Sequence, residues 1–252
     1  MAIPLQPNER LTVKTLPAPL RQAIQTFFAN APRGCALVGG TALAGYYAGH
    51  RESDDMDVFT ADARAQEFAV TAVKSLATLG TKFSDEMTTP AYYHCLAELD
   101  GHGFTIDIVR DPNLYRTGGF VTMPSGVTVA DLETLLKMKI AALVRRGSEK
   151  DLYDLVWLTE HYRQPSMEEW LKLGQDIDAG ATAEAMLASL LGQKPRATAC
   201  GFAQKFGMNA DKVMERIATF KTDLQKKLAI YLEQAPVDPA VAALIRKIKK
   251  LR

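Results

Sequence analysis

The pattern of hydrophobic positions changes its period near the middle of the chain. In the first half, apolar or alternating runs of strand length lie at residues 35–38, 56–59, 91–100 and 104–110. The last two of these runs are close enough in sequence to pair as a hairpin. Between the strands, residues 41–50 and 61–80 have helical composition and spacing. The first half is therefore predicted to mix strands with helices.

From residue 131 onward, the apolar positions recur with helical spacing. The predicted helices cover residues 131–147, 151–162, 167–177, 181–192, 210–234 and 238–252. Asp131 and Gly147 are suitable caps for the first of them. Residues 116–126 are rich in glycine and polar side chains, so we expect a loop there. The pattern predicts an α+β fold, with a small mixed sheet and flanking helices in residues 1–125 and an all-helical region in residues 126–252.

Composition excludes several classes of protein. A chain of 252 residues with 47% hydrophobic residues can bury a globular core, and a net charge of +1 provides no global attraction to nucleic acid or acidic membranes. Cys35, Cys95 and Cys200 lack the spacing of a disulfide framework or a zinc site, which favours a reducing, cytoplasmic environment. No apolar run approaches the roughly 20 residues that span a bilayer, so we expect neither secretion nor membrane insertion.

Acidic residues are concentrated where a predicted strand begins. Asp55 and Asp57 are two residues apart and share one face of the strand, whereas Met56 and Val58 face the core. Asp107 occupies the polar face of its own strand in the same way. If the two strands pair, three carboxylates converge, and Mg²⁺ or Mn²⁺ would relieve their repulsion. A calcium-binding loop fails on spacing, while a solvated acidic turn remains the alternative.

A glycine pair precedes this acidic strand. Gly39 and Gly40 lie between a predicted strand and a predicted helix, where unpaired backbone N–H groups attract anions. Without side chains, the pair would let a triphosphate approach the backbone, and the Thr41 hydroxyl could donate to it. The alternative is an ordinary turn.

A lysine and two aspartates in the helical half are the remaining polar candidates. Lys139 lies in the first helix, and Asp151 and Asp154 share one face of the next. Lys139 could neutralise a phosphate while an aspartate orients it. The alternatives are a solvated lysine and acidic residues that favour the helix dipole.

Two blocks of the sequence together resemble a known family. GGTALAGYYAGHRESDDMDVF and KIAALVRRGSEKDLYDLVWL are similar to the two signatures of the AbiEii/AbiGii-type nucleotidyltransferases, and Asp107 lies between them. The resemblance spans residues 35–160. It implies a nucleotidyltransferase core of the DNA-polymerase-beta type in residues 1–125, followed by the helical domain in residues 126–252. It also implies the toxin of a toxin–antitoxin or phage-defence system.

The resemblance assigns a role to each candidate residue. The implied metal ligands are Asp55, Asp57 and Asp107. The implied catalytic residues are these three together with Lys139, Asp151 and Asp154. The implied nucleotide-binding residues are Gly39, Gly40, Thr41, Arg51, Ser53 and Lys139. The implied reaction moves a nucleoside monophosphate from a nucleoside triphosphate to a hydroxyl, with Asp107 either holding a second metal ion or taking the proton of the acceptor.

The acceptor is the least determined part of this interpretation. RNA, and tRNA in particular, suits the resemblance, and basic residues near the end of the chain could bind phosphates: Arg246, Lys247, Lys249, Lys250 and Arg252. The alternative for that segment is a solvated helix. A protein hydroxyl as acceptor, or a non-catalytic module that binds a nucleotide or an antitoxin protein, are the other two functions left open.

Overall fold

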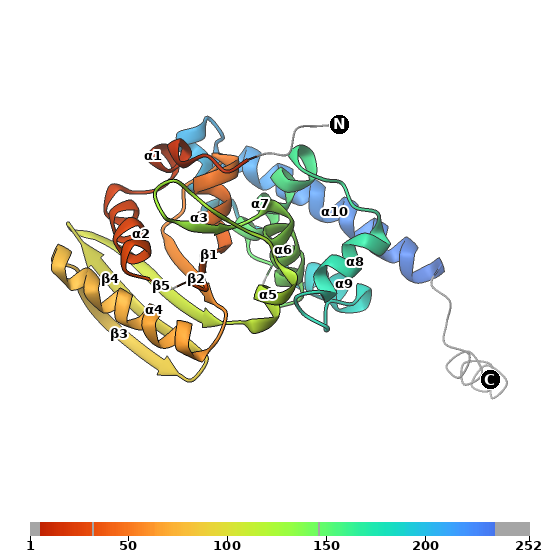
Figure 1. Ribbon diagram of the computed structural model, residues 1–252. Helices are drawn as coiled ribbons and strands as arrows, with labels where there is room; N and C mark the ends of the chain where they lie inside the picture. Colours follow the sequence, from red (N-terminus) through yellow and green to blue (C-terminus); the bar gives the residue numbers. More distant parts are fainter. Residues whose placement is uncertain (1–5, 32, 146, 235–252) are drawn as a thin grey trace.

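A computed structural model describes residues 6–31, 33–145 and 147–234, and a seven-stranded sheet forms its framework (Figure 1). The strands follow in the spatial order β3 (Lys82–Thr89), β4 (Tyr92–Leu99), β5 (His102–Arg110), β2 (Asp55–Thr60), β1 (Cys35–Leu37), β7 (Thr128–Ala130) and β6 (Phe120–Thr122). Strand β2 is parallel to β5 and antiparallel to β1, which is parallel to β7. This arrangement confirms the predicted mixed sheet.

The predicted strands are present, and three further strands were not predicted. Strands β4 and β5 pair antiparallel as the expected hairpin. Strand β3 was missed because nearly all of its residues are exposed, so it lacks an apolar alternation. Strands β6 and β7 are three residues long, and β6 lies within residues 116–126, which we expected to be a loop. Strand β7 extends the sheet beyond residue 125. The boundary between two domains at residues 125/126 stays a prediction.

Helices α2 (Ala18–Asn30) and α4 (Ala63–Ser75) contact each other and also contact β2 and β5. Strand β2 buries every second residue, including Met56 and Val58, which are fully inaccessible to solvent. Burial of such side chains stabilises the fold by about 1.5–3 kcal/mol each. The remaining residues of β2 are partly exposed, and this alternation places both of its aspartates on the face away from the core.

Short helices complete the first half of the chain. They are η1 (Glu9–Leu11), α1 (Thr12–Thr15), α3 (Gly39–Leu43), the π-helical turn η2 (Ala44–Ala48), η3 (Leu76–Leu79) and α5 (Pro112–Thr117). Helix α3 starts directly after β1 and leads into η2, so the chain reverses before it enters β2. This reversal places the glycine pair beside the acidic strand.

In the part of the second half that the structure describes, everything after β7 is helical or loop, as predicted. The helices are α6 (Leu132–Arg145), α7 (Glu149–His161), α8 (Met167–Gln175), α9 (Ala183–Gly192), η4 (Ala197–Ala199), η5 (Gly201–Phe206) and α10 (Ala210–Gln234). Helix α6 contacts α7, α8 and α9, while α10 packs on α7 and α9. Both α6 and α7 also contact α3, which joins the helical half to the glycine pair.

The predicted helix 238–252 and the basic residues in it lie outside the described residues. Each of the three cysteines is buried and unbridged. Within the described residues, every helix is too short or too polar to span a membrane.

Candidate functional site

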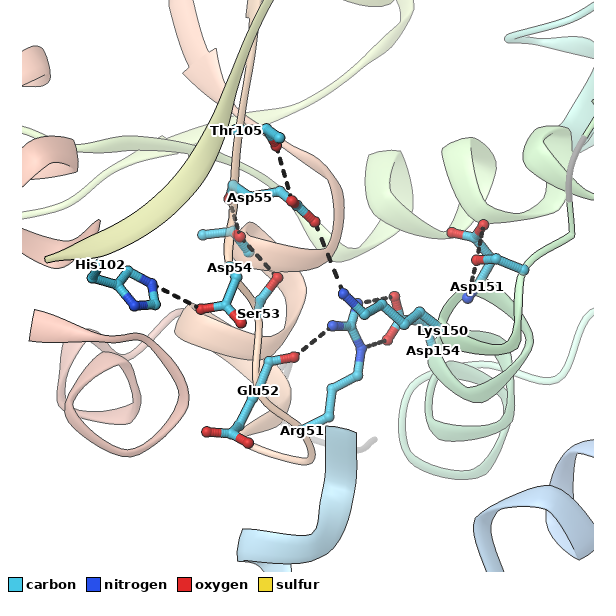
Figure 2. Close-up of polar contacts among 12 residues, drawn as sticks. Arg51, Glu52, Ser53, Asp54, Asp55, His102, Thr105, Lys150, Asp151 and Asp154 are labelled. Atoms are coloured by element: carbon cyan, nitrogen blue, oxygen red, sulfur yellow. Dashed lines mark hydrogen bonds and ion pairs between the residues drawn. The ribbon is translucent and has the colours of Figure 1, made fainter. Parts of the chain in front are cut away.

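The acidic residues of β2 and β5 lie on one face of the sheet. The two strands are paired in parallel with Asp57 directly beside Asp107 and with Asp55 beside Thr105. Directly paired residues of neighbouring strands project to the same side, as do residues two apart along one strand. Asp55, Asp57 and Asp107 are therefore neighbours on a common surface. The Thr105 hydroxyl donates a 2.9 Å hydrogen bond to Asp55 Oδ1 (Figure 2).

These carboxylates fit a metal ion that is shared with a substrate. Among the described residues, no three His, Cys, Asp or Glu side chains are grouped closely enough to hold a metal ion by themselves. Mg²⁺, however, is usually bound by one or two carboxylates together with water and substrate phosphates. The side chains of Asp55 and Asp107 are 44% and 23% exposed, so their oxygens are open to such a ligand. The donor set is thus of the chemical type that the predicted ion requires.

Two residues of β4, which the sequence analysis did not identify, contact Asp107. The Tyr92 hydroxyl donates to Asp107 Oδ1, and His94 Nδ1 lies 2.9 Å from the same oxygen. His94 pairs directly with Asp107 across the hairpin. The available signal was the alternation of residues 91–100, which places both side chains on the polar face. Their shared contact fixes the orientation of the Asp107 carboxylate.

The glycine pair allows two charged side chains to pack against the start of α3. Gly39 has a φ of +66°, a conformation that favours glycine, and a Cβ at this position would collide with the Asp57 carboxylate. A Cβ at Gly40 would collide with the Arg51 guanidinium. The glycines are therefore needed for close approach of the protein's own side chains. Phosphate binding by this turn stays a prediction.

Thr41 and Ser53 form hydrogen bonds beside the first residue of β2. Both side chains are buried, at 0% and 2% exposure. Thr41 Oγ1 is hydrogen-bonded to Ser53 Oγ at 2.9 Å and to the carbonyl oxygen of Asp55. These contacts hold the backbone of Asp55 against α3, and the phosphate contacts predicted for the two hydroxyls remain to be tested.

Next to this turn lies a buried network of charges. The Arg51 guanidinium donates to both carboxylate oxygens of Asp154, at 2.7 and 2.8 Å (Figure 2). Lys139 Nζ lies 2.7 Å from Asp154 Oδ2 and 2.7 Å from Asp151 Oδ1. His50 Nε2 is 2.9 Å from Asp154 Oδ1. Asp154 is thus contacted by four nitrogen atoms of three residues, which come from two segments: His50 and Arg51 before β2, and Lys139 in α6.

The network keeps Arg51, Lys139 and Asp154 charged despite their burial. Burial is the largest single influence on the pKa values of Arg51 and Lys139 and lowers them, but the nearby carboxylates of Asp154 and Asp151 together outweigh it, so both pKa values are raised. Burial would likewise raise the pKa of Asp154, yet Arg51 and Lys139 hold it well below its usual range. The result is a set of mutually compensated ions that joins β2 to helices α6 and α7.

Lys150 is an additional cation that the sequence analysis did not select. It precedes Asp151 in α7, its side chain is 44% exposed, and its Nζ lies 4.0 Å from Asp55 Oδ2 (Figure 2). Lys139, by contrast, is only 6% exposed and is already bound to two carboxylates. The basic residue in front of the DLYDL block was the signal that could have identified Lys150. It is better placed than Lys139 to contact a bound anion.

Comparisons with known proteins give one sequence family and several similar structures. The sequence model of the family described as "Nucleotidyl transferase AbiEii toxin, Type IV TA system" matches residues 26–221. None of the curated proteins matches the chain in sequence. MenT4, a nucleotidyltransferase toxin from Mycobacterium tuberculosis, is similar in structure with a TM-score of 0.51 and 17% identity, over 83% of this chain and 86% of that chain. JHP933 from Helicobacter pylori gives a TM-score of 0.49 and 20% identity, over 94% and 98% of the two chains. At 17% identity, the likeness to MenT4 concerns the fold.

Replacing Asp154 should destabilise the protein strongly. In Asp154→Asn, two buried cations lose their compensating charge, and breaking such a buried pair costs about 3–5 kcal/mol. Urea denaturation at neutral pH would measure this loss in the free energy of unfolding. Asp54→Asn is the matched control, since the side chain of Asp54 is 51% exposed and its replacement should change stability by less than about 0.5 kcal/mol. Equal effects of the two substitutions would contradict the structural role of the network.

His50 should make the stability depend on pH. Burial lowers the pKa of His50 despite its contact with Asp154. As the pH falls below about 6.5, the unfolded chain therefore binds a proton that the folded chain resists, and stability is lost. We expect the free energy of unfolding to decrease from pH 7 to pH 5.5, and to decrease less in His50→Gln. His161→Gln, at an exposed position, should retain the wild-type dependence. Identical pH profiles for all three proteins would argue against this assignment.

Proposed function

Because the chain belongs to the AbiEii family of nucleotidyl transferase toxins of type IV toxin–antitoxin systems, we propose that it transfers a nucleoside monophosphate to an RNA hydroxyl. In this reaction the acceptor oxygen forms a bond to the α-phosphorus of a nucleoside triphosphate, and pyrophosphate leaves. The observation that carries the proposal is the common face shared by Asp55, Asp57 and Asp107 beside the glycine pair. Transfer RNA is the acceptor that we would test first.

The carboxylates would divide the work of metal binding and proton transfer. Asp55 and Asp57 would hold Mg²⁺ or Mn²⁺, which when bound neutralises the charge of the triphosphate. Asp107 would accept the proton of the acceptor hydroxyl or add a ligand to a second ion. The contacts from Tyr92 and His94 would keep its carboxylate in a fixed orientation. Phosphoryl transfer depends mostly on such positioning and charge neutralisation.

The buried basic residues would support the site, whereas the exposed one would bind the substrate. Arg51 and Lys139 are balanced by Asp151 and Asp154, so their main effect would be to hold the glycine pair and the start of β2 in place. Lys150 is exposed beside Asp55 and would contact the triphosphate directly. We thus assign to Lys150 the neutralising role that the sequence suggested for Lys139.

The remaining partners follow from the family. A cognate antitoxin protein is the expected macromolecular partner, and a nucleoside triphosphate is the expected donor substrate. Both this reaction and three unbridged cysteines are consistent with a cytoplasmic protein.

A protein hydroxyl would use the same carboxylates, so the identity of the acceptor must come from an assay. Label from a triphosphate should appear in the RNA fraction of a cell extract, and label in the protein fraction alone would refute an RNA acceptor.

Removing either metal-binding carboxylate should abolish transfer without unfolding the protein. We expect Asp55→Asn and Asp57→Asn to lower pyrophosphate release with tRNA by at least about 100-fold, because each change removes several kcal/mol of charge stabilisation. Thermal unfolding should show no loss of stability, since each change also relieves repulsion between carboxylates. Asp54→Asn is the control and should retain activity. Full activity in either variant would refute the assignment.

Lys150→Gln should weaken binding of the triphosphate. Loss of a charge-assisted contact worth about 1.5–3 kcal/mol predicts an increase of KM for the triphosphate of about tenfold or more. Steady-state kinetics at saturating RNA would measure it, with Lys172→Gln, an exposed position on α8, as the control. An unchanged KM would show that Lys150 does not contact the triphosphate.

A further inference from the structure

An open cavity lies where α1, α7, η5 and α10 meet, and His50 of the buried network is part of its lining. Its volume is about 680 Å³, within the range of small-molecule sites. Its lining includes three cations and four aromatic rings: Lys14, Lys205, Arg216, His50, Tyr153, Trp157 and Phe206. None of the described residues that line it is a carboxylate. Cations combined with aromatic faces are the surface that proteins offer to single-stranded nucleic acid.

Two of the rings are stacked on each other, and a third is tilted against one of them. His50 and Tyr153 are stacked, with centroids 5.4 Å apart and planes inclined by 13°. Trp157 follows at 5.8 Å from His50. Tyr153 is buried, whereas Trp157 is partly exposed. The His161 ring is stacked on Trp157, with centroids 5.1 Å apart and planes inclined by 11°. A base that enters the cavity would contact the part of Trp157 that His161 leaves exposed.

His50 contributes an unsatisfied polar atom. Its side chain is 7% exposed, and its Nε2 contacts the carboxylate of Asp154, to which a neutral imidazole must donate. The other ring nitrogen, Nδ1, then carries a lone pair and has no hydrogen-bond partner among the described residues. This nitrogen is itself inaccessible to solvent, so it is not a contact that is open to a ligand.

The cations occupy separate parts of the rim. Lys14 belongs to α1 and is exposed, while Lys205 follows in η5. Lys205 and Arg216 pair with Glu52 and Glu160, which do not line the cavity. Lys205 and Arg216 are thus partly neutralised by carboxylates from outside the lining, but both side chains remain accessible, at 72% and 38% exposure.

We propose that this cavity binds one nucleotide of the RNA acceptor, with its base on Trp157 and its flanking phosphates at Lys14 and Lys205. The inference rests on the proposed function, which supplies RNA as the substrate. Asp154 connects the cavity with the glycine pair, since it binds His50, which lines the cavity, and also Arg51, which packs against Gly40. The cavity would hold the acceptor strand at a distance from the reacting hydroxyl and so determine which RNA is used.

Fluorescence of Trp157 provides a direct test. The chain has two tryptophans, so Trp170→Phe leaves Trp157 as the sole emitter. This protein would be titrated with a hexaribonucleotide and with 5′-AMP in EDTA, which removes metal-dependent binding at the carboxylates. We expect quenching, with the hexaribonucleotide binding more tightly. Adding Lys14→Gln and Lys205→Gln should weaken its binding about tenfold and reduce the salt slope by about 0.7 per lost charge. Lys172→Gln is the control and should change neither.

Each outcome of the titration either supports or overturns the proposed nucleotide site. Absence of quenching with both probes, or unchanged affinity in the double lysine variant, overturns the proposal. Quenching by 5′-AMP alone assigns the cavity to a free nucleotide and overturns the acceptor-strand assignment. Because the titration involves no turnover, quenching by the hexaribonucleotide in a protein that transfers no label would support the cavity while refuting the proposed function.

Discussion

The structure around the candidate site depends on one buried ionic interaction, the double hydrogen bond between Arg51 and Asp154. Arg51 precedes β2, and Asp154 lies in the second helix of the helical half, 103 residues later in the chain. An uncompensated charge in this position would be costly, so each partner requires the other. Lys139 adds a third segment by bridging Asp154 and Asp151. The glycine pair, the acidic strand and the helices are consequently held in one arrangement.

Charged residues near the site fall into two groups that differ in burial. Arg51, Lys139 and Asp154 are buried and satisfied by one another, so they contribute shape and rigidity. Asp55 and Lys150 are each 44% exposed and are open to a ligand. Rigid support beneath accessible reactive groups is a general requirement of preorganised sites. The division explains why neighbouring residues of one sequence block can have different roles.

The fold and the acidic strand were readily predicted, because apolar alternation and helical periodicity are local signals. The alternation of Met56 and Val58 with Asp55 and Asp57 correctly gave the exposed face of β2. Strand β3 could not be predicted, since its pairing with β4 rather than its own burial makes it a strand. The exposure of Lys150 and the burial of Lys139 depend on how α6 and α7 pack on α3, which the spacing of one helix does not specify.

The direct pairing of Asp57 with Asp107 makes the site sensitive to changes in chain length. Side chains in a strand alternate, so a slip of β5 by one residue would turn Asp107 into the core and bring Ile106 or Ile108 to the polar surface. Both isoleucines are fully buried, and the slip would expose them while burying a carboxylate. Insertions within β5 should thus be far less tolerated during evolution than substitutions, whereas the exposed strand β3 at the sheet edge is free to vary in length.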